Sequence, residues 1–274
     1  MDLWLEDLRS EFDRAFLVDW SQHIRQLNVD LKLSGSDLLV ETPRPPEFFW
    51  GDLEALQPSQ WVAVVSLNPQ VYSAKDEAWY QQQDWTPQAY WDYLNRRDLK
   101  GFREADYYYT RFARPLVKLA GPALGIVDPV SDEVTILMRR MALFEILPYA
   151  SRTYVPRPDI ASSLVVSDMG CAIAQQAALG AIKHRRPAAV LINGSDAVHV
   201  FAAVHQVVWT EQRYPSESNA PKSLRHWEAA YESDTGTVPV FGFPQLRGQS
   251  SHNSDVEIQQ LASRIAEVVR GRGA

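Results

Sequence analysis

The run from Trp61 to Tyr72 constrains the fold more than any other stretch of the chain. Its first five residues, Trp-Val-Ala-Val-Val, are apolar without alternation, which is typical of a strand buried on both faces of a sheet. Pro69 cannot continue a central strand, so the strand must end before it. Asn68 therefore follows the carboxyl end of a buried strand, where open α/β sheets bind ligands. An Asn-Pro pair is also a common plain turn, so it does not establish a site by itself.

Three more apolar runs have the character of buried strands: Met141–Leu147, Ala188–Ile192 and Val238–Phe243. Helical patterns alternate with them, at 86–94, 105–119, 163–182, 197–209 and from Ser254 onward. Thr86-Pro87 is typical of a helix cap followed by proline, and Ser254-Asp255-Val256-Glu257 is a capping-box pattern. Pro115 indicates a kink or an earlier end of its helix. This alternation predicts an α/β fold, a three-layer α/β/α sandwich around a central, mainly parallel four-stranded sheet. Pro239 favours an edge position for the last strand. The polar stretch 211–236 is predicted to be a loop.

The chain is predicted to form a single domain over residues 1–274. Residues 1–57 form an amino-terminal extension, made of a helix over 2–27 and a hairpin that pairs Leu31–Leu33 with Leu38–Val40. Residues 58–270 form the α/β core.

Composition excludes several classes of protein. With one cysteine, the chain cannot form an intrachain disulfide, and this favours a reducing, cytoplasmic location. No Cys/His cluster indicates a metal site, no cofactor motif is present, and no apolar run of about 18 residues indicates a membrane span. The amino terminus lacks the basic and then apolar pattern of a signal sequence. A net charge of −7 argues against a broad basic face for nucleic acid, although it allows a local one.

A polar or proline-containing turn follows each of the four predicted strands. These turns are Asn68-Pro69, 145–151, 193–196 and 243–254. Because the carboxyl ends of parallel strands lie at one edge of a sheet, the four turns should converge on one crevice.

The order of these turns resembles that of the uracil-DNA glycosylase superfamily, over roughly residues 58–270. The family's first loop, of the Gly-X-Asp/Asn-Pro type, is matched by Ser66-Leu67-Asn68-Pro69-Gln70. Near the family's base-reading Asn this chain has Glu145, followed by the Pro-aromatic pair Pro148-Tyr149. The third turn, Gly194-Ser195-Asp196-Ala197, matches Gly-X-X-Ala. Phe243-Pro244-Gln245-Leu246-Arg247 stands where the family has His-Pro-Ser or Asn-Pro-Ser and a duplex-probing loop.

The resemblance implies a DNA glycosylase-like protein that hydrolyses the N-glycosidic bond of a flipped damaged or modified base, with DNA as its partner. Asn68 would place the water, and His252 would be a second catalytic candidate. The alternative for His252 is an exposed position in a loop. The implied base-binding residues are Gln70, Tyr72, Glu145 and Tyr149. The implied nucleic-acid-binding residues are Ser195, Gln245, Leu246 and Arg247.

Two departures from the family pattern bear on this function. Phe243 occupies the position of the catalytic His and cannot stabilise a departing base anion. This favours the alternative of a non-catalytic nucleic-acid or nucleotide-binding module of the same fold. Glu145 as an ionised carboxylate would only accept hydrogen bonds, and would therefore select a base with an exocyclic amine. Alternatively, Glu145 points away from the crevice in a salt bridge.

Two unrelated functions receive less support. A hydrolase using Ser195, Asp196 and His199 would lack the Gly-X-Ser-X-Gly turn around its nucleophile. A dinucleotide-binding protein would need Gly-X-Gly-X-X-Gly after its first strand, and this sequence is absent there.

Overall fold

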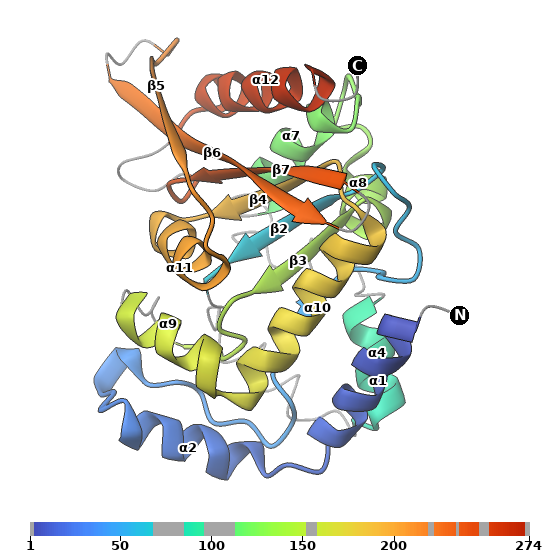
Figure 1. The fold of residues 1–274 in the computed structure, drawn as a ribbon, viewed down its shortest axis with the longest axis vertical. Coiled ribbons are helices and arrows are strands. Elements are labelled where there is room, and N and C mark those ends of the chain that lie inside the picture. Colours follow the sequence, from blue (N-terminus) through green and yellow to red (C-terminus); the bar gives the residue numbers. More distant parts are fainter. Residues whose placement is uncertain are drawn as a thin grey trace.

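The computed structural model describes residues 3–67, 85–95, 113–151, 158–218, 222–233, 236–246 and 252–271. In these parts, the chain forms a seven-stranded mixed sheet in the order β1-β3-β2-β4-β7-β6-β5 (Figure 1). The strands are Phe49–Trp50 (β1), Val62–Ser66 (β2), Met141–Glu145 (β3), Ala189–Asn193 (β4), Thr210–Pro215 (β5), Ser223–Ser233 (β6) and Gly236–Phe243 (β7).

The four predicted strands correspond to β2, β3, β4 and β7, and they are adjacent and mutually parallel. A four-stranded sheet is nevertheless wrong. β1 pairs antiparallel with β3, while β6 and β5 extend the sheet antiparallel beyond β7. The predicted loop over 211–236 therefore contains most of two strands. β5 escaped prediction because it is an edge strand with one buried residue in six and no apolar alternation.

Pro239 does not mark a sheet edge, since β7 lies between β4 and β6. The ladder between β4 and β7 begins one residue later, at the pair Val190 and Val240. On that side of the strand no hydrogen bond is required from position 239, so the missing N–H of proline is tolerated.

Helices cover both faces of the sheet, so the fold has three layers. One apolar cluster joins alternate strand residues such as Ala63, Val65 and Phe144 to helices of one layer. These are α1 (Leu3–Ala15), α2 (Trp20–Asp30), α4 (Pro87–Asn95), α9 (Pro158–Ser167), α10 (Met169–Arg185) and α11 (Ser195–His205). The other cluster joins Val62, Val64 and Leu143 to α7 (Arg114–Ala123), α8 (Glu133–Arg139) and α12 (Asp255–Gly271). In Figure 1, α12 lies above the strands, and α2 and α9 lie below them.

The amino-terminal extension differs from its prediction. The single helix over 2–27 is two helices, because Asp19 starts α2 by accepting a hydrogen bond from the Gln22 amide at 3.0 Å. The hairpin is also wrong. Gly35–Asp37 forms a 3-10 turn, and Leu39 instead makes a bridge to Ser151. The Asn28 side chain holds Leu39 in place through both of its backbone groups, at 2.8 and 2.9 Å.

Other helix ends agree better with the sequence. Thr86 caps α4 by accepting the Ala89 amide at 3.1 Å. Ser254 and Glu257 form the predicted capping box of α12, at 3.3 and 3.2 Å. The helix predicted over 105–119 is described from residue 113, and Pro115 lies in the first turn of α7, where proline is tolerated. The helix predicted over 197–209 already begins at residue 195 and ends at 205, as α11.

Asp168 joins the amino-terminal extension to the helical layer of the core. The predicted helix over 163–182 is interrupted here, and α9 and α10 meet at 87°. One Asp168 oxygen accepts the Cys171 amide and the Tyr149 hydroxyl, and the other lies 2.8 Å from His23 Nε2. Burial alone would raise the pKa of Asp168, but these hydrogen bonds outweigh it and lower the pKa.

The bend at Asp168 also bears on membrane insertion. In the described ranges, no single helix is long and apolar enough to cross a bilayer. α9 and α10 reach that length and apolarity only together, across their sharp bend.

We expect Asp168→Ala to lower the free energy of unfolding by about 2–4 kcal/mol, because it removes a helix cap and leaves buried partners unpaired. Urea unfolding would measure the change. Asp132→Ala is a matched control, since Asp132 precedes α8 at the same position but makes no capping hydrogen bond. A control loss as large as that of Asp168→Ala would contradict the role of the network.

Candidate functional site

The order of the parallel strands places a topological switch point between β2 and β4. The chain continues from β2 to β3 on one side of it, and β4 then pairs with β2 on the other. Open α/β sheets bind ligands outside the carboxyl ends of the strands at such a point. Here these ends are Ser66 for β2 and Asn193 for β4.

Three polar side chains form a row across this edge of the sheet. Ser66 pairs in register with Glu145 of β3, and the pair Val65 and Ile192 places Asn193 beside Ser66. Since side chains alternate along a strand, all three point to the face covered by α7 and α12. Neighbouring strands lie about 4.8 Å apart, so the row extends over about 10 Å. We call Glu145, Ser66 and Asn193 the polar row.

Two members of the polar row have polar atoms without partners. Ser66 is 8% exposed and its Oγ makes no hydrogen bond, while the covered Oε2 of Glu145 makes none either. Asn193 is 7% exposed, and its Oδ1 accepts the Leu246 amide at 3.3 Å. Buried polar groups are nearly always paired in folded proteins, so two adjacent exceptions mark this edge as unusual.

The charge of Glu145 differs from the sequence-based expectation of an ionised carboxylate. Burial, with a further contribution from the negative charge of Glu47, raises the pKa of Glu145 to about 8. The group is therefore mostly protonated at neutral pH, and can donate one hydrogen bond as well as accept others. The alternative of a salt bridge is not observed, because no cation in the described ranges pairs with Glu145.

The structure describes only part of the predicted site. Asn68, Gln70, Tyr72 and Arg247 lie outside the described residues. Ser195 is the first residue of α11, which begins directly after β4. The residue before it is Gly194, which has no side chain that could cap the first amides of α11.

The two remaining residues of the turn after β7 differ in exposure. Gln245 is exposed to solvent. Leu246 is buried in the apolar cluster beneath α12 and is only 6% exposed. Its side chain is therefore not free to enter a duplex in this conformation, contrary to the prediction.

Tyr149 was predicted to stack on a base, but it lies in the protein core. Its side chain is 1% exposed, and its ring packs near Trp20 and His23. Burial raises its pKa, so the hydroxyl stays protonated and donates to Asp168. The prediction failed because residues of the amino-terminal extension, distant in sequence, cover this ring.

His252 was predicted as a catalytic candidate, with an exposed position in a loop as the alternative. The structure agrees with neither. The side chain is fully buried, and its Nε2 lies 2.8 Å from the Tyr214 hydroxyl. Tyr214 belongs to β5, a strand that the sequence did not reveal. Burial lowers the pKa of His252 to about 4, so the imidazole is neutral at pH 7.

A second buried histidine lies beside the position where the superfamily carries its catalytic one. The register of β6 and β7 pairs Trp227 with Gly242, so His226 lies opposite Phe243. His226 Nε2 lies 2.8 Å from Glu228, and its Nδ1 has no hydrogen-bond partner. The side chain is 1% exposed, so it is shielded from solvent and from any ligand at the edge.

Ser66 and Asn193 were not predicted as site residues, although the sequence contains a signal for them. The segments Val-Ala-Val-Val-Ser, Met-Ala-Leu-Phe-Glu and Ala-Val-Leu-Ile-Asn each end four apolar residues with one polar residue. In parallel strands at matched register, such residues must become neighbours. The sequence does not show the register of the strands, and therefore it did not reveal that these residues are neighbours.

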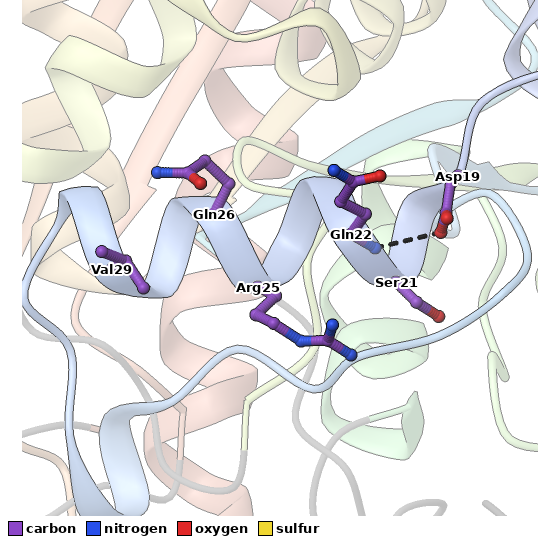
Figure 2. A pocket seen from close by; sticks show the side chains of 6 residues that line it. All are labelled: Asp19, Ser21, Gln22, Arg25, Gln26 and Val29. Carbon is purple, nitrogen blue, oxygen red and sulfur yellow. Dashed lines mark hydrogen bonds between the residues drawn. The ribbon is translucent and has the colours of Figure 1, made fainter.

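A surface hollow on α2 is no competing site. Figure 2 shows its lining side chains along the outside of this single helix, with Asp19 bonded to the Gln22 amide. Arg25 in this hollow is paired with Glu41. Among the described residues only α2 and its cap line this hollow, so we assign it no catalytic role.

The lowered pKa of His252 predicts acid sensitivity. The unfolded state takes up a proton near pH 6.5 and the folded state near pH 4, so stability is complete above pH 6.5 and falls as the pH drops towards 4. We expect His252→Gln to flatten this dependence by up to about 3 kcal/mol, measured by urea unfolding at several pH values. His184→Gln, at an exposed position, controls for loss of an imidazole. Equal slopes in His252→Gln and wild type would contradict the prediction.

The raised pKa of Glu145 predicts the opposite dependence. As the pH rises from about 4.5 to 8, the unfolded chain releases this proton first, so the wild-type protein loses stability. We expect Glu145→Gln to be more stable than wild type at pH 8 by about 2–4 kcal/mol, and nearly equal to it at pH 4.5. The exposed Glu54→Gln variant is the control. A Glu145→Gln variant that is less stable at pH 8 would show that the carboxylate is stabilised when ionised.

Comparison of the sequence with protein-family models and with curated proteins found no match. What the protein does must therefore be inferred from its residues and their geometry.

Proposed function

We propose that this protein binds a nucleobase extracted from DNA at the polar row and hydrolyses its N-glycosidic bond. The observation that carries the proposal is the row itself: three polar side chains at the switch point of a parallel sheet, two with unpartnered polar atoms. Planar heterocycles present several hydrogen-bonding groups along one edge, and a straight row of donors and acceptors complements such an edge.

The remaining roles follow from the resemblance. Asn68, two residues after the end of β2 in the sequence, would position the attacking water through its amide. The start of α11 at Ser195 would bind a phosphate of the extracted nucleotide, because helix amino termini attract anions. Gln245 and Arg247, which follow β7, would contact the DNA backbone. Hydrolysis of this bond requires mainly positioning and charge stabilisation, for which these groups suffice.

A second candidate function is recognition of a base without cleavage. It is favoured because neither His226 nor His252, the histidines nearest to Phe243 and to the turn after β7, is available. Phe243 is fully buried, His252 is bonded to Tyr214, and His226 is shielded. A protein of this kind would bind the same bases at the same row and leave the strand intact.

A panel of DNA oligomers, each with one damaged or modified base, separates the two functions. We expect incubation followed by heating in alkali to break the strand at one type of base. Binding without breaks would favour the reader, and neither binding nor breaks would reject both functions.

We expect Asn68→Ala to lower the rate of base release by about 100-fold or more, because positioning of a reacting group contributes at least this much to catalysis. The thermal midpoint should change little if the residue serves catalysis. Single-turnover cleavage and a thermal melt would measure the two effects. Asn253→Ala is the control, since Asn253 is exposed and contributes its backbone amide to the α12 cap. A large loss of stability with unchanged cleavage would assign Asn68 a structural role.

A further inference from the structure

We propose that Glu145 and Ser66 bind one edge of the ligand as a neutral pair, with the Glu145 carboxyl group donating its proton in a hydrogen bond to an acceptor of the ligand. This inference rests on the proposed function, and names the residues and the charge state that determine its specificity. The ligand class is an uncharged heterocycle whose edge carries a donor directly beside an acceptor.

The geometry of the pair supports this inference. Ser66 and Glu145 are register partners on neighbouring parallel strands, and both side chains point to the same face. Ser66 is more than nine-tenths buried, with an unpartnered Oγ, and Glu145 Oε2 beside it is unpartnered too. Two unpaired buried polar groups side by side destabilise the unliganded fold. A ligand that bonds to both would remove this cost.

The surroundings of Glu145 favour its uncharged form. Burial and the nearby carboxylate of Glu47 both raise its pKa. Glu47 has Arg44 at 3.9 Å, whereas no cation among the described residues pairs with Glu145. The neighbouring groups on β2 and β1, Ser66 and the pair Phe49–Trp50, carry no charge. In the described structure, Glu47 is thus the charged group that contributes to the raised pKa of Glu145.

A protonated carboxyl group matches a ligand edge on which an acceptor lies next to an N–H donor. Its O–H donates to a ligand carbonyl or ring nitrogen while its C=O accepts from an adjacent N–H, so two parallel hydrogen bonds form. The Ser66 hydroxyl can donate or accept, and would bond to the next group along the edge. An ionised carboxylate would lose the first of these bonds. Binding should therefore weaken when the pH rises above 8.

The test measures binding to single-stranded DNA oligomers that contain one 2′-fluoro nucleotide, whose sugar resists cleavage, between pH 6 and 9.5. We expect wild-type affinity to fall about tenfold or more from pH 7 to 9.5, because a bond between buried groups is lost. Glu145→Gln keeps a donor and an acceptor without titrating, so it should bind like wild type at pH 7 and show no such fall. Glu145→Leu should bind about tenfold or more weakly throughout.

Ser66→Ala should weaken binding several-fold at every pH and keep the pH dependence. Glu54→Gln and Ser163→Ala, both at exposed positions, are the matched controls and should behave as wild type. A thermal melt of each variant shows whether it is folded.

Three results would overturn the inference. Wild-type binding that is independent of pH would show that the proton of Glu145 is not donated. Binding that strengthens above pH 8 would indicate a cationic base held by an ionised Glu145. Unchanged binding by folded Ser66→Ala and Glu145→Leu variants would place the ligand elsewhere. The first two results leave the proposed function intact, whereas the third would place the base away from the polar row. Absence of binding to every oligomer would reject the function as well.

Discussion

Burial of four parallel strands on both faces is the constraint on which the rest of the structure depends. β3, β2, β4 and β7 pair side by side, and their side chains fill two separate apolar clusters, one under each helical layer. Such strands can only be joined by crossovers that return outside the sheet, so all four carboxyl ends lie at one edge. The position of the candidate site is a consequence of this topology.

The polar row is an exception to the apolar, buried character of the strands that carry it. Residues 62–65, 141–144 and 189–192 are apolar and fully or almost fully buried, and the next residue on each strand is polar. Glu145 in particular is held uncharged by its surroundings, which costs stability at and above neutral pH. Groups that destabilise a fold in this way are concentrated at functional sites, because preorganised polar groups are needed there.

The other polar networks of the molecule have structural roles. Asp168 fixes the junction of α9 and α10 against His23 and Tyr149, and these groups are all paired. Glu257 accepts hydrogen bonds from Ser216, Ser218 and the start of α12, and they hold its pKa low although burial alone would raise it. The groups of these networks are paired and structural, whereas the unpartnered atoms of Ser66 and Glu145 mark candidate functional groups.

The sequence by itself determined the parallel strands, the α/β class, the caps at Thr86 and Ser254, and the edge at which polar turns converge. These features depend on local patterns: apolar runs, proline, and the spacing of capping residues. The sequence did not reveal β5 and β6, because β5 is an edge strand that buries little and the buried residues of β6 do not alternate strictly with exposed ones. It also misplaced Tyr149 and His252, whose surroundings come from the amino-terminal extension and from β5.

Only the tertiary structure decided which polar residues meet and what charge they carry. The register between β2, β3 and β4 brings Ser66 together with Glu145 and Asn193, which lie 79 and 127 residues further along the chain. The pKa of Glu145 depends on burial and on Glu47, and neither can be read from the residues next to it in sequence. Local propensity acts over a few residues, whereas register and desolvation depend on the whole packed sheet.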